Sequence, residues 1–412
     1  MAKKRVIFLN SIFPVLSETF LFSQYTKMLD EGMAMDLVSS HKPDPSQVHP
    51  GMETVQKQVD YLCDASKGEI VAAHLHCLMR YPLGYLRSLA GLFSVEEKSF
   101  TTLKHLSGAA LTLQRYADCS DPRWVHSHFT YGATSIAMWI KRISGLPFSL
   151  TLHGSDLTFD NPPDLETKLK EADLVVCISQ YNVDYVKEHF PTVAADKLVV
   201  LPLGVAPLEQ APQAKHYDGS RPLRILSVGR LSTQKAQEYL VRACAQLRDK
   251  GLAFECQLVG EGPQREFLEQ EIQRLNLEGQ VKLLGVRYHS DVLEMYKEAD
   301  LFVMSSVAEG MPIVLMEAMQ AGVPVLSTSI SGIPELLDYG MAGILVPPGS
   351  ENALAESMEA VIKGEIDLDD LRQHAIEHIA NNFDQGKNAV RFQQLLEQCC
   401  AAEEKVVSSV TN

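Results

Sequence analysis

The feature that most constrains this chain is a regular alternation of short apolar runs with segments of helical periodicity. Twelve runs fall into two sets of six: Val6–Leu9, Met35–Val38, Trp124–His126, Phe148–Leu152, Leu174–Ile178 and Leu198–Leu201, then Leu223–Val228, Phe254–Val259, Val281–Leu284, Leu301–Met304, Val323–Ser327 and Gly343–Val346. Uninterrupted apolar strands separated by helices are typical of parallel sheets covered on both faces. The pattern therefore predicts an α/β chain with two doubly wound domains.

A proline-rich stretch separates the two sets of strands. It holds Pro202, Pro207, Pro212 and Pro222 with polar residues between them, which is typical of a linker. We predict one domain over 1–205 and a second over 206–385. A helical pattern over about 386–404 places Phe392, Leu395 and Leu396 on one face of a final helix.

Charge and cysteine usage narrow the function. Lys and Arg number 37 and Asp and Glu 52, so the formal net charge is −15, which disfavours nucleic acid as a partner. Residues 1–206 carry 19 basic and 22 acidic residues, and the remainder carries 18 and 30. Eight scattered cysteines without a CxxC pair indicate reduced thiols and a cytoplasmic location.

Residues 70–116 form an unusual stretch in the first half. It mixes aromatic with basic side chains, namely Tyr81, Tyr85, Phe93, Phe100, Arg80, Arg87, Lys98 and Lys104. Such a mixture suits a surface that contacts a membrane. It also suits an ordinary pair of core helices with solvated arginines, and Glu96 and Glu97 weaken the basic character. Both interpretations stay open. Under the first, a membrane surface is a partner of this protein.

The most informative segment follows the predicted strand that ends at Met304. A polar loop carries Glu309 and Gly310, and Pro312 is predicted as the first residue of a helix, where a proline loses no hydrogen bond. A helix start suits a diphosphate, and carboxylates such as Glu309 and Glu317 accept hydrogen bonds from sugar hydroxyls. Alternatively, Glu309 caps the helix and Glu317 is solvated.

Two further strands lead into glycine turns. The first turn contains Gly229, Arg230 and Lys235, and two cations at the carboxyl end of a strand indicate an anion site in an acidic domain. The second contains Gly260 and Gly262, which allow a ligand to approach the backbone closely or simply make a turn.

Histidines follow two strands of the first half. His126 and His128 stand two residues apart, which puts them on one face of an extended strand, and His153 precedes Asp156 by three residues. A histidine at this edge of a sheet hydrogen-bonds a ligand, moves a proton, or is a satisfied structural residue. The residues alone leave these alternatives open.

In this order, the segments resemble those of retaining GT-B glycosyltransferases of family 4 (glycosyl transferases group 1). The likeness spans nearly the whole chain and is strongest over 223–337, where Gly-Arg-Leu-x3-Lys, Val-Gly-Glu-Gly-Pro and Glu-x7-Glu occur. Ser17-Glu18-Thr19, His126-Ser-His128 and His153-Gly-Ser-Asp156 resemble a subgroup that builds exopolysaccharides of colanic-acid or amylovoran type. Ala236 departs from the family pattern, which usually has glycine after the lysine.

The resemblance implies a GT-B fold: two Rossmann-like domains face a central cleft, the first binding acceptor and the second donor, and the C-terminal helix crosses back to the first domain. Catalytic roles are implied for His153, Glu309, Arg230 and Lys235. Donor contacts are implied for Gly229, Arg230, Lys235, Gly260, Val286, Arg287, Glu309, Gly310, Met311, Pro312 and Glu317. Acceptor-side roles are implied for Ser17, Glu18, Thr19, His128 and Asp156.

The implied function is that of a retaining hexosyltransferase. It moves a sugar from a nucleotide-diphosphate sugar, with a UDP-sugar preferred, to a glycan or polyprenyl-diphosphate-linked acceptor in exopolysaccharide or cell-surface polysaccharide biosynthesis. We expect no cofactor and no metal, because Arg230, Lys235 and the helix start stabilise the leaving group. The enzyme is expected in the cytoplasm, and contact with the inner membrane stays open. The alternatives are a nucleotide-sugar epimerase of similar fold and a non-catalytic nucleotide-sugar-binding subunit.

Overall fold

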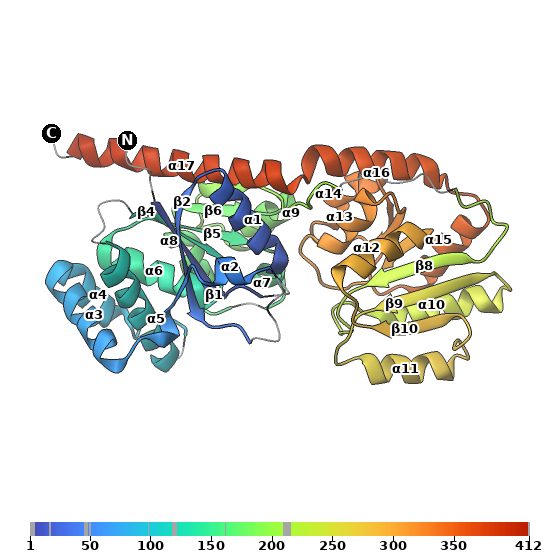
Figure 1. Cartoon of the computed structure of the whole chain (residues 1–412), viewed down its shortest axis with the longest axis horizontal. Coiled ribbons are helices and arrows are strands. Elements are labelled where there is room, and N and C mark those ends of the chain that lie inside the picture. The colour runs from blue at the N-terminus through green and yellow to red at the C-terminus, as the bar shows by residue number, and fades with distance from the viewer. Residues whose placement is uncertain are drawn as a thin grey trace. The chain divides into compact units, whose positions relative to one another are not determined.

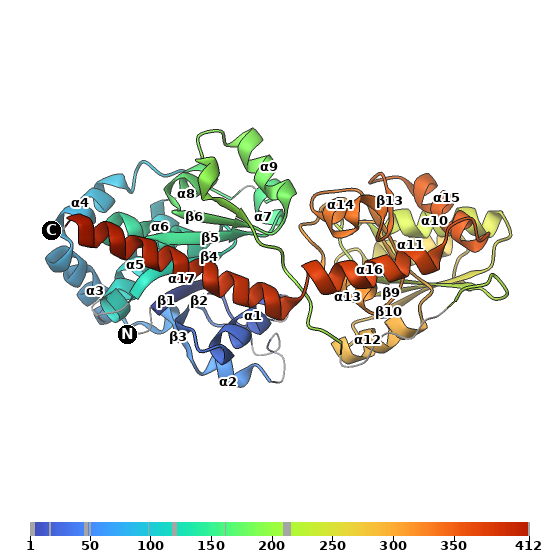
Figure 2. The same ribbon diagram turned by 90° about the horizontal axis from the view of Figure 1, so that it is seen from above.

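The chain divides into two compact units (Figures 1 and 2). Unit 1 comprises residues 1–201 and 386–412, and unit 2 comprises residues 202–385. The computed structural model describes residues 5–15, 18–44, 48, 51–97, 99–117, 122–160, 162–208 and 216–410. Within these residues, no helix is long and apolar enough to cross a membrane.

Unit 1 is built on a seven-stranded parallel sheet in the order β3-β2-β1-β4-β5-β6-β7. The strands are β1 (Arg5–Ile12), β2 (Ala34–His41), β3 (Val59–Tyr61), β4 (Pro122–His128), β5 (Phe148–Leu152), β6 (Leu174–Cys177) and β7 (Leu198–Val200). The helices are α1 (Thr19–Asp30), α2 (Glu53–Gln56), α3 (Lys67–Arg80), α4 (Pro82–Gly91), α5 (Ser99–Thr112), α6 (Gly132–Ser144), α7 (Ser155–Thr158), α8 (Leu165–Glu171), α9 (Gln180–His189) and α17 (Gln385–Val410).

Both faces of this sheet are covered. Because side chains alternate along a strand, Ile7 and Leu9 of β1 enter the core that includes residues of α3, α5 and α6, while Val6 and Phe8 enter a second core. Phe392 and Leu396 of α17 belong to this second core and are fully buried. The final helix therefore returns to unit 1, as predicted, and Figure 2 shows it lying along the sheet of that unit.

Unit 2 is built on a six-stranded parallel sheet in the order β10-β9-β8-β11-β12-β13. The strands are β8 (Leu223–Val228), β9 (Phe254–Val259), β10 (Val281–Gly285), β11 (Leu301–Met304), β12 (Val325–Thr328) and β13 (Ile344–Val346). The helices are α10 (Gln237–Asp249), α11 (Arg265–Arg274), α12 (His289–Glu298), α13 (Ile313–Gln320), α14 (Ile333–Leu336), α15 (Glu351–Ile362) and α16 (Leu368–Asn382).

The strand order of unit 2 reverses between β8 and β11, as that of unit 1 does between β1 and β4. Ligands of open α/β sheets bind at such a switch point, beyond the carboxyl ends of the strands. In unit 2, α10, α11 and α15 contribute to the core on one face, and Figure 1 shows α13 and α16 on the opposite side of the sheet. The predicted α/β fold with two doubly wound sheets is confirmed.

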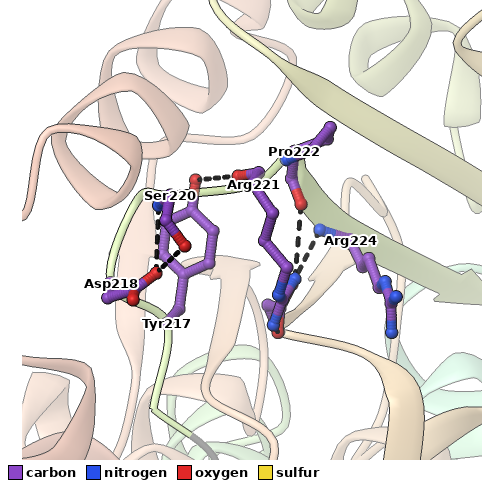
Figure 3. A network of polar contacts seen from close by, with 7 residues as sticks. Tyr217, Asp218, Ser220, Arg221, Pro222 and Arg224 are labelled. Carbon is purple, nitrogen blue, oxygen red and sulfur yellow. Dashed lines mark hydrogen bonds and ion pairs between the residues drawn. The ribbon is translucent and has the colours of Figure 1, made fainter.

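An ion pair with a buried carboxylate fixes the start of unit 2, and Figure 3 shows Arg221 beside Pro222 and Arg224. Arg221, which is half-buried, donates two hydrogen bonds to Asp300, from Nη1 to Oδ2 at 2.5 Å and from Nη2 to Oδ1 at 2.6 Å. The carboxylate also accepts the backbone N–H of Arg224, and its side chain is 1% exposed. The pair ties Arg221, two residues before β8, to Asp300, directly before β11. Residues 217–222, predicted as the end of a linker, belong to unit 2, where Tyr217 packs against the core.

Candidate functional site

The turns after β8 and β9 pack backbone against backbone. Leu231 N–H donates to the carbonyl of Glu261, and Gly229 N–H donates to that of Val259, both at 2.9 Å. A Cβ on Gly260 would lie 2.0 Å from the Gly229 oxygen, and one on Gly262 would lie 2.2 Å from the Leu231 oxygen. These two glycines are therefore required by the contact between the turns. A donor contact at Gly260 stays a prediction.

The turn after β8 carries the two predicted cations into different surroundings. Arg230 is exposed, and within the described residues its guanidinium makes no hydrogen bond or ion pair. Lys235 is partly buried, and its Nζ lies 2.5 Å from Oε1 of Glu309. Ser306 Oγ donates to the same carboxylate oxygen at 2.6 Å. The structure thus brings Lys235 and Glu309 together across 74 residues of sequence.

The loop after β11 is joined to the turn that carries Lys235. Ser305 Oγ donates to the carbonyl of Ala236 at 3.0 Å, and Val307 N–H donates to that of Gln234 at 2.8 Å. Ala236 has φ +49°, in the left-handed region that disfavours a side chain. This conformation gives a physical reason for the glycine that the family pattern has here.

The start of α13 presents backbone donors at the same edge. Pro312 is the N-cap residue and the helix begins at Ile313, so the prediction of proline as first helical residue was wrong by one position. An extended backbone at Pro312, with ψ 120°, keeps it outside the helix. Within the described residues, the N–H groups of Gly310 and Met311 donate no hydrogen bond. They are available to an anion, as are the first N–H groups of α13.

Glu317 lies on α13, and its carboxylate is hydrogen-bonded to two side chains of α12. His289 Nε2 lies 2.9 Å from Oε1, and Tyr296 donates its hydroxyl to Oε2 at 3.2 Å. The hydrogen bond to Glu317 raises the pKa of His289. The prediction of a merely solvated Glu317 is excluded by these contacts. Sequence reasoning missed His289 and Tyr296, although both lie in the helix that directly follows the predicted base-reading residues.

The residues after β10 are open to solvent. Val286 is 68% exposed, and Arg287 is exposed and donates from Nη1 to the carbonyl of Val286 at 3.1 Å. Their place beyond the carboxyl end of β10 puts them on the same sheet edge as Gly229 and Gly310. Their contact with a nucleotide base stays a prediction.

Three histidines gather at the carboxyl edge of the unit 1 sheet. His128 Nδ1 lies 3.0 Å from His153 Nε2, and the rings of His126 and His128 are 4.8 Å apart. His126 is held by Ser149 Oγ at 2.7 Å and by Thr151 Oγ1 at 3.1 Å. Burial lowers the pKa of His126 and of His153 to about 3, and that of His128 below its ordinary range, so all three are neutral near pH 7.

Unsatisfied polar atoms remain in this cluster. His128 Nε2, His153 Nδ1 and Asp156 Oδ2 are buried and have no hydrogen-bond partner within the described residues. The other oxygen of Asp156 accepts the backbone N–H of His153 at 2.9 Å. Burial raises the pKa of Asp156 to about 7. Asp156 therefore fixes the turn that presents His153, and a buried imidazole with a free nitrogen points to a ligand.

The remaining acceptor-side predictions lie at the start of α1. Glu18 is the N-cap residue, and burial raises the pKa of its carboxyl to about 7. Thr19 begins α1 and is exposed. Ser17 lies outside the described residues. Within the described part of the chain, no three His, Cys, Asp or Glu side chains gather as a metal site.

Comparison with known proteins decides the class of activity. Residues 212–378 match the family model described as Glycosyl transferases group 1, and residues 58–207 match the one described as Glycosyltransferase Family 4. The chain is a glycosyltransferase. Both matched domains contribute to the sheet edges described above.

This glycosyltransferase resembles relatives that are named for the same class of activity, and solved structures share its fold. It is 27% identical to the putative colanic acid biosynthesis glycosyltransferase WcaL of Escherichia coli, over 90% of this chain and 94% of the relative. It is also 27% identical to the amylovoran biosynthesis glycosyltransferase AmsK of Erwinia amylovora, over 95% and 98%. Its fold matches Anabaena HepE in complex with UDP-glucose, with TM-score 0.67, 20% identity and coverage of 96% and 99%. Sucrose-phosphate synthase of Thermosynechococcus elongatus matches with TM-score 0.71, 18% identity and coverage of 97% and 100%.

Proposed function

We propose that this glycosyltransferase takes a nucleotide-diphosphate sugar as donor and holds it at the carboxyl edge of the unit 2 sheet. The observation that carries the proposal is the Lys235–Glu309 pair, at the same sheet edge as Arg230 and as the N–H groups of Gly310 and Met311. Within the described residues, neither the Arg230 guanidinium nor these two N–H groups have a partner. Two cations and two N–H donors suit a diphosphate. Residues 202–385 carry 15 basic and 27 acidic residues, so the attraction for an anion is local.

The proposed chemistry follows from these groups. The bond between the anomeric carbon and the phosphate oxygen breaks, and Arg230, Lys235 and the start of α13 stabilise the negative charge on the departing diphosphate. An acceptor hydroxyl forms the new bond on the same face of the sugar, and its proton passes to the departing phosphate. This route retains the anomeric configuration, makes the enzyme a retaining hexosyltransferase, and requires no metal because the fixed cations neutralise the leaving group.

The remaining donor groups have proposed roles along the same edge. When the diphosphate binds, Lys235 pairs with it instead of with Glu309, and the Glu309 carboxylate then accepts hydrogen bonds from hydroxyls of the transferred sugar. The Glu317 carboxylate accepts hydrogen bonds from the ribose hydroxyls in place of its contact with His289. Val286 and Arg287 contact the base. HepE was solved with UDP and with UDP-glucose, which supports a UDP-sugar as the donor. His153 is proposed to contact the transferred sugar near its anomeric carbon.

The acceptor is proposed to be a glycan or a polyprenyl-diphosphate-linked glycan. WcaL and AmsK are named for colanic acid and amylovoran biosynthesis, and a Bacillus subtilis relative, 27% identical over 69% of this chain, is named for teichuronic acid biosynthesis. These names support a role in exopolysaccharide or cell-surface polysaccharide synthesis. Glu18, Thr19 and His128 lie at or beside the carboxyl edge of the unit 1 sheet, where an acceptor hydroxyl would meet them.

A donor panel tests the proposal. UDP-, GDP- and ADP-sugars are incubated with and without acceptor glycan, and products are identified by mass spectrometry and by anomeric coupling constants. Lys235→Ala and Glu309→Ala are each expected to lower kcat/KM by roughly 100-fold, because each removes a group that acts on the developing charge or the sugar. Lys250→Ala is the control, since it breaks a surface ion pair with Glu359 in the same unit.

The outcomes separate the alternatives. An isomerised nucleotide sugar formed without acceptor would identify an epimerase. Calorimetric binding of nucleotide with no turnover on any acceptor would identify a non-catalytic binding subunit. Unchanged kcat/KM in Lys235→Ala and Glu309→Ala would contradict the residue assignments even if transfer is observed.

A further inference from the structure

Large apolar side chains are exposed together on three helices of unit 1. Half of the exposed large apolar residues in the described chain fall within 33 residues of sequence. Together they form what we call the α3–α5 apolar surface: Val71, Leu75, Leu78 and Met79 on α3, Leu83 and Leu86 on α4, Phe93 in the next loop, and Phe100 and Leu103 on α5. Phe93 is 87% exposed and Met79 is 77% exposed. A grouping of this kind marks a contact surface in a folded protein.

The spacing on α3 shows that the exposure is systematic. Val71, Leu75, Leu78 and Met79 recur at intervals of four, three and one, which places them on one face of the helix. Ala73 and Cys77 lie on the other side and are fully buried in the unit 1 core. The helix is thus apolar on its core side and on its outer side. A surface helix that meets only water has a polar outer face.

The three helices form one surface. His74 of α3 lies between its neighbours: its Nδ1 is 2.7 Å from the hydroxyl of Tyr85 on α4, and its Nε2 is 3.0 Å from Ser107 Oγ on α5. Figures 1 and 2 show α3, α4 and α5 beside one another at one end of unit 1. The exposed apolar residues therefore belong to a connected layer held by partly buried polar contacts.

Cations are interleaved with this apolar surface. Arg87 stands next to Leu86 on α4, and Lys104 lies with its Nζ 4.7 Å above the ring centre of Phe100. Arg80 follows Met79, and its guanidinium lies 5.4 Å from the ring centre of Tyr81. Long basic side chains of this kind rest their stems on apolar surface and direct their charge to a lipid headgroup.

The carboxylates near this surface make local contacts within unit 1. Glu69 closes the capping box of α3 by accepting the N–H of Ser66 at 2.7 Å. Glu97 lies 2.7 Å from His105, and Glu96 accepts the N–H of Asp164 at 3.1 Å. Residues 67–104 carry five lysine and arginine side chains against three glutamates, so this apolar stretch is net basic on a chain whose net charge is −15. An anionic membrane repels such a chain in other orientations, so attraction is confined to this face.

We propose that the α3–α5 apolar surface docks on an anionic lipid bilayer. The helices lie in the plane of the interface, Met79, Leu83 and Phe93 enter the boundary between headgroups and acyl chains, and Arg80 and Arg87 contact lipid phosphates. The interleaved cations favour lipid over a protein partner. The inference deepens the proposed function, because a polyprenyl-linked acceptor lies in such a bilayer. Docking itself does not depend on the donor chemistry.

The test is co-flotation of the full chain with vesicles. Vesicles of phosphatidylcholine mixed with phosphatidylglycerol are compared with vesicles of phosphatidylcholine alone. Met79→Ser/Leu83→Ser/Phe93→Ser is expected to lower the partition coefficient at least about tenfold, because three large side chains leave the interface. Arg80→Gln/Arg87→Gln is expected to remove the preference for phosphatidylglycerol and to weaken the salt dependence.

Matched variants in unit 2 serve as controls. Phe267→Ser/Met341→Ser removes exposed apolar side chains, and Arg224→Gln/Lys282→Gln removes exposed cations, each without touching α3–α5. These variants are expected to float as the unaltered chain does. Circular dichroism checks the fold of every variant, and transfer to a water-soluble acceptor is measured separately. Lost flotation with unchanged transfer to that acceptor assigns the defect to docking and leaves the proposed function intact.

Three results would overturn the inference. The first is a failure of the unaltered chain to float with phosphatidylglycerol vesicles. The second is equal flotation of the unaltered chain and the triple serine variant. The third is self-association, measured by sedimentation velocity, that the triple variant abolishes while no vesicle binding occurs, since the surface would then join two copies of the chain.

Discussion

At the scale of single residues, one hydrogen bond links His128 to His153 in unit 1. The 3.0 Å contact between His128 Nδ1 and His153 Nε2 joins two neutral rings, so one nitrogen donates and the other accepts. If His128 donates, His153 carries its own proton on the unpartnered Nδ1 and offers it to a ligand. If His153 donates, its Nδ1 accepts instead. His128 is thereby a positioning residue for His153.

Substitution of His128 tests this dependence. His128→Leu leaves His153 Nε2 buried without a partner, and kcat is expected to fall roughly tenfold or more with a smaller change in the KM of the donor. His128→Asn keeps an amide near the position of Nδ1 and is expected to recover most of kcat. Steady-state kinetics of both variants, with circular dichroism for folding, measure this. Equal activities of the Leu and Asn variants would contradict the positioning role.

The buried carboxyl of Asp156 gives unit 1 a distinctive pH dependence. Its pKa is raised to about 7, whereas in the unfolded chain it has its ordinary value near 4. Between those values the folded state holds a proton that the unfolded state has released, so the contribution of Asp156 to stability falls as pH rises and levels off above about 7. The three buried histidines, whose pKa values are lowered by burial, contribute in the opposite sense below about pH 6.5. For one such group the slope is about 1.4 kcal/mol per pH unit.

Asp156→Asn is expected to flatten this dependence. The amide is neutral at every pH, and its oxygen accepts the His153 N–H as the carboxyl does. Urea unfolding from pH 5 to pH 8 should therefore show the free energy of unfolding of Asp156→Asn rising with pH relative to that of the unaltered chain, until the difference levels off above about pH 7. Asp196→Asn, at an exposed site, is the control and should follow the unaltered chain. A slope that Asp156→Asn leaves unchanged would assign the pH dependence to other groups, such as Glu18.

Sequence patterns predicted which side chains gather at the carboxyl edge of the unit 2 sheet better than they predicted the contacts between them. A parallel sheet collects the carboxyl ends of its strands at one edge, so the positions after the strands, together with the family resemblance, predict which residues gather there. They are Arg230, Lys235, Glu309 and Glu317. The pairing of Lys235 with Glu309 joins positions 74 residues apart, and no local pattern specifies which carboxylate meets which cation. The engagement of Glu317 by His289 likewise depends on how α12 and α13 pack.

At the scale of elements, continuous apolar runs were predictable and edge strands with polar residues were not. Leu301–Met304 occurs with the predicted bounds, because it is a continuous apolar run in a sheet covered on both faces, and all four residues are buried. Val59–Tyr61 was missed, since this edge strand has three residues and a central aspartate. The bounds of α13 shifted at Pro312 because local backbone geometry, and not composition, sets the first helical residue.

The ion pair that precedes β8 and β11 makes a prediction about unit 2. Arg221→Ala leaves the Asp300 carboxylate buried with the Arg224 N–H but without its counter-charge, and the free energy of unfolding of unit 2 should fall by about 2–4 kcal/mol. Lys297→Ala, which breaks the exposed pair with Glu294, should change it by less than about 1 kcal/mol. Urea denaturation measures both.

A double-mutant cycle sharpens this experiment. If the two groups act as one pair, Arg221→Ala/Asp300→Ala should be destabilised by less than the sum of the single variants, because the double variant buries no lone charge. Additive effects would show that Arg221 and Asp300 stabilise unit 2 independently.

At the scale of the whole molecule, donor binding should be detectable in one unit. UDP at about 100 times its dissociation constant stabilises the protein that binds it by about 2.7 kcal/mol. If the donor site is as proposed, hydrogen exchange should slow in residues 229–236 and 305–317, where turns and the start of α13 bear the anion-binding groups. Lys235→Ala at the same UDP concentration should lose this protection. Protection that appears solely in unit 1 would contradict a donor site on unit 2.

The return of α17 to unit 1 has a consequence for biosynthesis. The ribosome delivers all seven strands of the first sheet by residue 200, yet Phe392 and Leu396, which close one of its faces, follow the whole of unit 2 in the sequence. Unit 2 is complete as a nascent chain by residue 385. The later unit in the sequence can therefore finish folding during translation before the earlier one, whose Phe8 and His126 lack their ring contacts with Phe392 until α17 is made.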